Sequence, residues 1–315
     1  MGRSEKRKNL NLAMSAPNKS RRQIATFLLL LFAFSAVFYC LILVAHKLEA
    51  GRGLYVSGLM WCPALAAVTT LKLSGQKLSG LGWKWPETRY AVASWFIPLL
   101  YATIGYLIIW IFGFGGFPNQ EFMGQLVDRM GLKASPTVST VVYLFLSGTV
   151  GLVNSLANAL GEEIGWRGFL VPELFKNMGF TATALFSGII WALWHYPVLI
   201  GADYNAGTPA WYGLICFTVM VLAISFIFAW MRLKSGSLWT AALLHASHNL
   251  YVQSIFTPLT HNSGNTPWFI DEFGVVLPIV TIAFAIFFWS RRGELAAIVP
   301  QLTQETASGV SAGVP

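Results

Sequence analysis

Long apolar runs, each close to the length of a membrane-spanning helix, dominate the pattern of hydrophobic and polar positions along the chain. A helix needs about 20 predominantly apolar residues to cross a bilayer. The pattern therefore predicts an all-α, polytopic membrane helix bundle of about eight transmembrane helices. The runs fall at 24–45, 54–71, 91–113, 138–161, 181–200, 211–231, 237–256 and 274–290.

Composition supports a membrane protein. Of the 315 residues, 55% are hydrophobic and 11% are charged, whereas about 25% of the residues of a soluble domain are charged. The three cysteines lie inside the apolar runs without metal or disulfide spacing, which indicates packing residues. The first run is longer than the apolar region of a cleavable signal, so we expect it to remain as a signal anchor.

Lysine and arginine placement predicts the orientation, because positively charged loops stay on the cytoplasmic side. With the N-terminus inside, the outer loops hold only four of the 21 basic residues, namely Lys47, Arg52, Arg129 and Lys133. Both termini are then cytoplasmic, and we expect an integral protein of a prokaryotic plasma membrane. This bias explains the net charge of +8 with no nucleic-acid partner.

The chain divides into one membrane domain and two tails. We predict a basic cytoplasmic N-terminal tail (1–22), a membrane-embedded domain (23–292) and a flexible C-terminal tail (293–315). The longest outer loop, 114–136, is expected to hold a short interfacial helix. No internal repeat at a fixed period and no similar halves are found, although many transporters have such repeats.

The stretch NALGEEIGWRGFL, residues 158–170, places two carboxylates directly after an apolar run. One interpretation ends the helix near Leu160 and leaves the acids in cytoplasmic water. The other continues the helix, bent at a glycine or proline, to a turn near Met178. Glu162 lies 16 residues before that turn and His195 lies 17 after it, so the continued helix predicts that both groups share one depth in the membrane.

Helical spacing assigns partners to these polar residues. Glu163 and Arg167 are four residues apart and can form an ion pair on one helix face, whereas Glu162 projects elsewhere and stays available for chemistry. In HASHN, His245 and Asn249 are also four apart. Taken singly, the two glutamates fit the end of a helix and His195 fits a hydrogen-bonded core histidine. His245 with Asn249 fits a hydrogen-bonding patch between helices. Together they predict one intramembrane cavity, because ionisable groups inside spans are costly.

This set of groups is suited to hydrolysis. A carboxylate and an imidazole can activate water directly. They can also hold a metal-bound water, for which Glu162, His195 and His245 are the candidate ligands of a divalent metal such as zinc. His245 and Asn249 can donate hydrogen bonds to an oxyanion. The H-E-x-x-H, G-x-S-x-G and phosphate-loop motifs are absent from the sequence.

Three motifs together resemble those of the CPBP family, which comprises CAAX prenyl endopeptidases and bacteriocin-processing proteins and is also called the abortive-infection family. The resemblance covers about 140–255 and rests on EEIGWR, on Trp191 with three residues before His195, and on HASHN. It implies a hydrolase, an intramembrane protease often described as a metalloprotease. The catalytic residues it implies are Glu162, His195, His245 and Asn249, with Glu163 and Arg167 in support.

The preferred hypothesis is therefore an intramembrane endopeptidase that cuts peptide or protein substrates in a cavity opening towards the cytoplasm. The alternatives are a non-catalytic relative that binds peptides as an immunity or scaffold protein, and a proton-coupled transporter. The sequence leaves open the need for a metal, the prenylation of the substrate and the oligomeric state.

Overall fold

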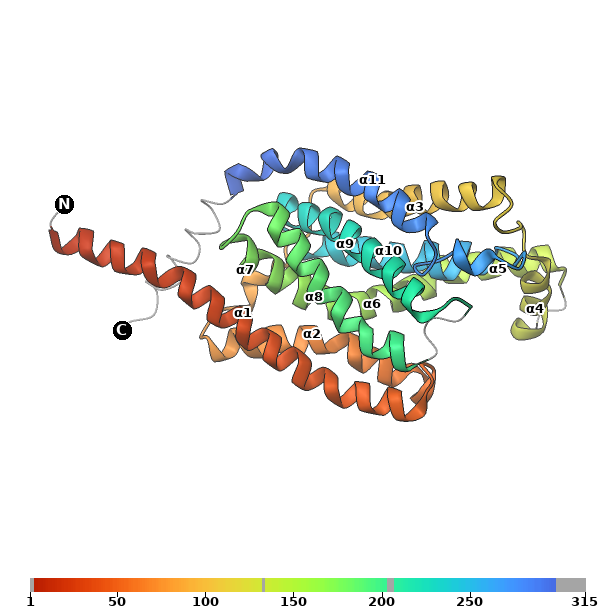
Figure 1. Ribbon diagram of the computed structural model, residues 1–315, viewed down its shortest axis with the longest axis horizontal. Helices are drawn as coiled ribbons and strands as arrows, with labels where there is room; N and C mark the ends of the chain where they lie inside the picture. The colour runs from red at the N-terminus through yellow and green to blue at the C-terminus, as the bar shows by residue number, and fades with distance from the viewer. Residues whose placement is uncertain (1–2, 132–133, 203–206, 299–315) are drawn as a thin grey trace.

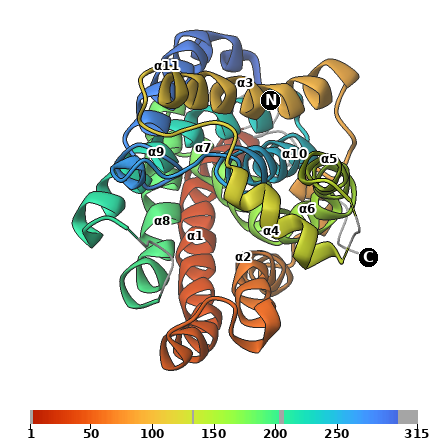
Figure 2. The ribbon, with the colours of Figure 1, turned by 90° about the vertical axis from the view of Figure 1, so that its right-hand side faces the viewer.

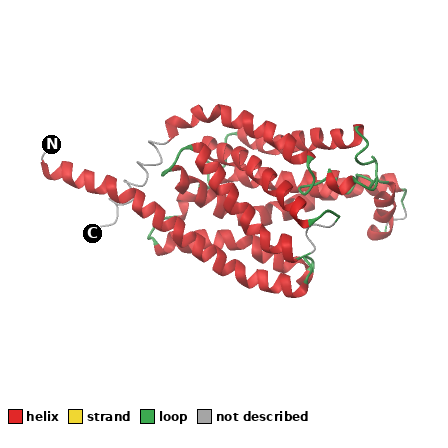
Figure 3. Ribbon diagram, viewed as in Figure 1, coloured by secondary structure: helices red, strands yellow, loops and turns green. Residues whose placement is uncertain are grey.

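The computed structural model describes residues 3–131, 134–202 and 207–298. Within these ranges the chain is helical apart from its connections, and no strand is formed (Figure 3). A single antiparallel bridge joins Gly116 to His261. The predicted all-α polytopic bundle is confirmed. Residues 299–315 of the predicted C-terminal tail lie outside the described residues.

The helices follow the predicted apolar runs closely. The α-helices are α1 (Arg3–Ala45), α2 (Leu54–Leu73), α3 (Thr88–Ile111), α4 (Gln120–Met130), α5 (Pro136–Leu146), α6 (Leu152–Glu163), α7 (Val171–Phe175), α8 (Phe180–Gly201), α9 (Ala210–Ser235), α10 (Leu238–His248) and α11 (Val276–Ser290). Three π-helical segments are η3 (Ser147–Gly151), η4 (Ile164–Leu170) and η5 (Asn249–Phe256), and four 3₁₀ segments are η1 (Ala50–Gly53), η2 (Leu78–Leu81), η6 (Thr266–Trp268) and η7 (Arg291–Ile298).

Two predicted boundaries differ from the structure. Residues 3–22, predicted as a separate tail, continue directly into α1 as helix. Among the described residues, seven helices are long and apolar enough to cross a membrane. The eighth predicted span, 237–256, corresponds to α10 and η5, which carry imidazole and amide side chains. Nearly every α10 residue is buried, so this helix faces protein rather than lipid and needs less apolar character.

The long helices run roughly along one axis, with α1 and α2 on one side and α3 and α11 on the other (Figures 1 and 2). The α2–α3, α7–α8 and α9–α10 connections lie at one end, on the left of Figure 1. We call this the basic end, because Lys77, Lys176 and Lys234 lie there. The α1–α2 and α8–α9 connections and α4 lie at the opposite end, which we call the far end.

The helix that carries the two glutamates continues as predicted. Helical backbone runs from Pro136 to Phe175, with the π-helical segment η4 immediately after Glu163. Gly161 and Gly165 let α2 approach closely, since a Cβ at Gly161 would lie 2.8 Å from the Met60 carbonyl oxygen and one at Gly165 would lie 2.5 Å from Pro63 Cβ. This contact removes both glutamates from the surface.

Candidate active site

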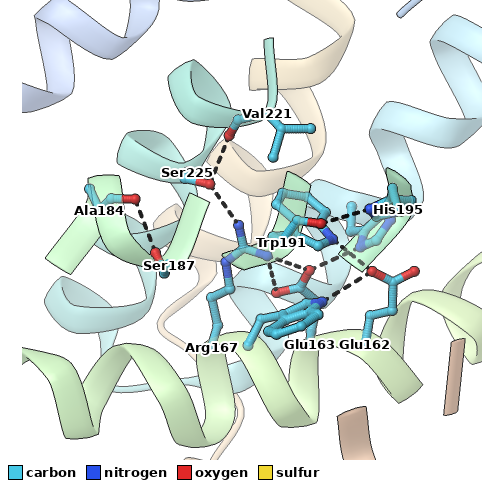
Figure 4. A network of polar contacts seen from close by, with 11 residues as sticks. Glu162, Glu163, Arg167, Ala184, Ser187, Trp191, His195, Val221 and Ser225 are labelled. Atoms are coloured by element: carbon cyan, nitrogen blue, oxygen red, sulfur yellow. Dashed lines mark hydrogen bonds and ion pairs between the residues drawn. The ribbon is translucent and has the colours of Figure 1, made fainter. Parts of the chain in front are cut away.

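Glu162 is buried and held by two indole groups. Its Oε2 accepts a hydrogen bond from Trp166 Nε1 at 3.1 Å and another from Trp191 Nε1 at 2.8 Å. Trp166 lies one helical turn after Glu162, whereas Trp191 comes from α8 (Figure 4). Both described hydrogen bonds end on Oε2, so Oε1 has no described partner. The carboxylate is therefore oriented by neutral donors rather than by a cation.

Glu163 lies in a different environment from its neighbour. Arg167 Nη1 contacts both of its oxygens, at 2.9 and 3.2 Å, so the structure has the ion pair that the spacing predicts. His245 Nδ1 also lies 2.9 Å from Glu163 Oε1. The guanidinium of Arg167 stacks 4.1 Å from the ring centre of Trp191. Glu163 and Arg167 are almost completely buried, which makes them a supporting pair beneath Glu162.

His195 is placed on α8 one turn after Trp191, and it is half-buried. Its Nδ1 lies 2.9 Å from the backbone carbonyl oxygen of Trp191. A carbonyl oxygen can only accept, so Nδ1 carries the proton and Nε2 keeps its lone pair in the neutral ring. His195 therefore presents a base to the space beyond its own helix.

A cavity of about 400 Å³ joins the predicted groups. Its lining includes all four predicted catalytic residues, Glu162, His195, His245 and Asn249. The polar side chains of Asn154, Asn158, Gln253 and Glu272 also belong to this lining. The structure therefore brings the three motifs to one cavity, and it places Glu163 and Arg167 behind the cavity wall.

The predicted metal ligands do not form a ligand set in this arrangement. Within the described residues, no group of three or more His, Cys, Asp or Glu side chains is placed to hold a metal ion. One ring nitrogen of His245 already contacts Glu163. The donor geometry thus does not fit the predicted Glu162, His195 and His245 set.

A second acid and histidine pair lies in the same cavity wall. His248 Nε2 contacts Glu272 Oε1 at 2.9 Å, and His248 Nδ1 contacts the Tyr101 hydroxyl at 2.6 Å. Burial raises the pKa of Glu272, but the hydrogen bonds from His248 and Gln253 and the charge of His248 together outweigh it and hold the pKa below its usual range. Burial, reinforced by the Glu272 charge, raises the pKa of Asp271 to about 7.

Sequence reasoning missed several members of this site. Trp166 could have been found, because it lies four residues after Glu162 on the same helix face. Trp191 was recognised only as the aromatic of the His195 motif, and its indole bond to Glu162 depends on how α8 docks against α6. Glu272 carried no sequence signal, since it belongs to a connection outside the predicted motifs.

The lining of the cavity lies towards the far end of the bundle. The sequence predicts a mouth towards the cytoplasm, on the side of the basic loops. The lining instead includes Leu48 and Glu272, both in far-end connections, and no residue of a basic-end connection.

Comparison with known proteins places these residues in a family context. The model of the family described as "Type II CAAX prenyl endopeptidase Rce1-like" matches residues 137–251. A curated relative, "CAAX prenyl protease 2" of Methanococcus maripaludis, is 30% identical over 143 residues, which are 44% of this chain and 46% of the relative. The match thus spans less than half the length of that relative.

The matched region contains every residue of the predicted site. Glu162 and Glu163 with Arg167, then His195, then His245 with Asn249 all lie within 137–251, and the folded chain directs them to one buried centre. Glu272 lies outside the match, in a part of the chain that the family model does not cover. The matched region, which holds the whole predicted site, is thus similar to the Rce1-like CAAX prenyl endopeptidase family.

Proposed function

We propose that this protein is an intramembrane endopeptidase in which Glu162 and His195 activate a water molecule for attack on a peptide bond. The observation that carries the proposal is the shared cavity, which collects an acid, two imidazoles and a carboxamide from three helices. Hydrolysis needs a base near the attacking water and hydrogen-bond donors near the developing oxyanion. The cavity supplies candidates for both.

Glu162 is suited to act as the general base. Two indole N–H groups fix its Oε2, so the other oxygen can accept a proton from water without rotation of the carboxylate. His195 supports the same water, because its Nδ1 proton is committed to the Trp191 carbonyl and its Nε2 can accept a hydrogen bond. A positioned base of this kind contributes a factor of about 10² to 10⁴ in rate.

His245 and Asn249 are the proposed oxyanion donors, and the structure sets a condition on His245. Its Nδ1 faces Glu163, so in the neutral ring with the proton on Nδ1 the Nε2 atom is an acceptor. Donation from Nε2 to an oxyanion therefore requires the imidazolium form, which the Glu163 carboxylate stabilises. The Asn249 amide can donate at any pH.

The proposed substrate is a peptide segment of a membrane-associated protein. The name of the curated relative refers to prenyl proteins, and the proposal for this chain is limited to peptide-bond hydrolysis. The integral membrane location is given by the apolar helices, and we propose the plasma membrane of a prokaryote, with both termini cytoplasmic, as its site.

The test uses the full chain in proteoliposomes with fluorescence-quenched peptides. The set contains a farnesylated C-terminal peptide and unprenylated peptides that mimic membrane-proximal segments. We expect cleavage of at least one peptide by the wild type and a rate lower by about 10²- to 10⁴-fold for Glu162→Gln. His195→Ala should show a comparable loss. The control is Glu121→Gln, which changes an exposed acid on α4 outside the cavity.

Two results would contradict the proposal. Full activity of both Glu162→Gln and His195→Ala would remove these residues from the chemistry. Tight binding of peptides by the wild type, with no cleavage of any peptide in the set, would instead favour the non-catalytic peptide-binding relative.

A further inference from the structure

The cavity extends in one direction from the glutamate pair. On η3 and α6, which run from the far end towards the basic end, the lining residues Gly151, Asn154 and Asn158 all precede Glu162. The same helix contributes no lining residue after Glu162. The hollow space therefore lies on the far-end side of Glu162.

The neighbouring helices place the cavity on the same side of Glu162. The segment formed by α10 and η5 runs in the opposite direction, and its lining residues continue past His245 to Ser254. On α2, which starts at the far end, the lining residues Val56, Leu59 and Met60 all come from its first half. Antiparallel helices thus place the cavity in the same half of the bundle.

The opposite side of the site is closed by packed side chains and backbone hydrogen bonds. Arg232 Nε donates to the Arg167 carbonyl oxygen at 2.8 Å, and its Nη2 donates to the Leu81 carbonyl oxygen at 3.3 Å. The Leu238 N–H donates to the Gly82 carbonyl oxygen at 2.8 Å. Leu81, Arg167 and Arg232 are at most 5% exposed. A separate hollow of about 780 Å³ lies at the basic end between α3, α9 and α11, and it shares no lining residue with the cavity that holds Glu162.

Basic side chains identify which end faces the cytoplasm. Three Lys and Arg side chains described in the structure lie at the far end: Lys47, Arg52 and Arg129. Twelve lie at the basic end: Lys19, Arg21, Arg22, Lys72, Lys77, Lys84, Arg89, Lys176, Arg232, Lys234, Arg291 and Arg292. Because short loops rich in Lys and Arg remain cytoplasmic, the basic end is the cytoplasmic end.

We infer that the cavity opens to the extracytoplasmic side of the membrane and takes its peptide from there. The substrate class is then a segment of an exported or membrane-anchored protein that lies beside the outer membrane surface, rather than the C-terminus of a cytoplasmic protein. The direction of access stands on the cavity and the charges alone, whereas the cleavage of such a segment rests on the proposed function.

The chemistry of the outer part of the cavity suits a peptide backbone. Asn154 on α6 and Gln253 on η5 offer exposed amide groups, and Glu272 offers a carboxylate from the connection between η5 and α11. Amide side chains provide both donors and acceptors, which an extended peptide needs when it leaves water. Apolar residues of α2 and α9 supply the remaining wall.

Cysteine accessibility tests the direction of access without measuring hydrolysis. The starting protein replaces the three native cysteines, Cys40, Cys62 and Cys216, with alanine. Single cysteines are then introduced as Asn154→Cys in the cavity, Glu121→Cys at the far-end surface and Lys77→Cys at the basic-end surface. Spheroplasts that express the full chain are treated with a charged, membrane-impermeant maleimide before and after lysis.

We expect Glu121→Cys and Asn154→Cys to react in intact spheroplasts and Lys77→Cys to react only after lysis. The inference is overturned if Asn154→Cys follows Lys77→Cys, or if Lys77→Cys reacts from outside. It is also overturned if Asn154→Cys stays unreactive even in detergent, since a thiol in a water-filled cavity must react. If Asn154→Cys fails to accumulate, Gly151→Cys replaces it, because a Cβ there makes only ordinary contacts.

Failure of the proposed function gives a different result. A protein that binds peptides but never cleaves them would still show Asn154→Cys labelling from the outer side. A protease with a cytoplasmic entrance would cleave the peptides but label only after lysis. The two experiments therefore separate access from chemistry.

Discussion

Immediately around the glutamate pair, the side towards the basic end is packed with buried side chains, whereas the side towards the far end contains the cavity. Glu162 and Glu163 are adjacent in the chain but belong to these two different regions. Glu163 faces Arg167 and His245 in a nearly water-free setting. Glu162 faces the cavity and receives hydrogen bonds from two neutral indoles.

This difference shows how one helix can carry a structural acid and a reactive acid side by side. A buried charge without a partner is costly, and a nearby cation removes that cost. A cation held directly against Glu162 would weaken it as a base, because an adjacent positive charge favours the ionised carboxylate. Neutral donors orient Glu162 and favour its ionised form less strongly than a cation would.

Breaking the ion pair on the packed side should have the largest effect on stability. Arg167→Met leaves the Glu163 carboxylate buried without its guanidinium partner, so we expect a loss of about 3–5 kcal/mol in the free energy of unfolding. The measurement is unfolding of the full chain in mixed micelles. The double variant Glu163→Gln with Arg167→Met should recover part of the loss, because it removes the uncompensated charge.

The control for this prediction is a surface ion pair of the same chemistry. Arg89 contacts Glu87 at 3.0 Å, with both side chains more than two-thirds exposed. Arg89→Met should leave stability almost unchanged, since water screens an exposed pair. Equal effects of Arg167→Met and Arg89→Met would contradict the packed character of this side.

The indole contacts on the cavity side should affect activity more than stability. Trp191→Phe keeps the aromatic ring but removes the N–H that donates to Glu162 Oε2. A hydrogen bond to a charged group contributes about 1.5–3 kcal/mol, which corresponds to a reduction of about 10- to 100-fold in kcat/KM. Peptide cleavage in proteoliposomes measures this change.

Trp194→Phe is the matched control on the same helix. Its indole donates to Ser35 Oγ at 2.8 Å rather than to a carboxylate of the site. We expect kcat/KM for this variant to stay within a few-fold of the wild type. A larger loss for Trp194→Phe than for Trp191→Phe would show that packing of α8, and not the bond to Glu162, controls the activity.

Local spacing predicted the parts of the site that belong to one helix. The Glu163 and Arg167 contact and the common face of His245 and Asn249 follow from residues four apart. The meeting of Glu162 with His195 followed from counting residues on both sides of one turn. These inferences need only helix geometry, which is the same in every context.

The rest of the site depends on how the helices pack. The bond between Trp191 and Glu162 requires a particular rotation of α8. The contact between His248 and Glu272 requires the far-end connection to return over the cavity. The position of the cavity depends on which side the packed residues close, and nothing in the sequence indicates that Arg232 packs against the carbonyl oxygens of Arg167 and Leu81. Such tertiary contacts have no periodic signature.

Asp271, in the connection between η5 and α11, offers a test of the difference between the two sides of the glutamate pair. Its carboxyl is buried on the far-end side, where the cavity lies. Burial raises the pKa of Asp271 to about 7 from an ordinary value of 3.8. The folded protein then retains a proton that the unfolded chain has lost, so this residue should reduce stability as pH rises from about 4 through 7. Glu272 has the opposite effect on stability, because the hydrogen bond from His248 lowers its pKa. Its contribution to stability is lost as pH falls.

Asp271→Asn should therefore gain Tm relative to the wild type between pH 5 and pH 8. Asparagine tolerates the positive φ of 66° at this position, so the backbone need not change. The control is Asp128→Asn, an exposed site on α4, whose difference in Tm from the wild type should not vary with pH. If Asp271→Asn behaved in the same way as this control, the Asp271 carboxyl would be hydrated in the folded protein. The far end would then be open to water beyond the cavity itself, and the difference between the two sides would be greater than the structure indicates.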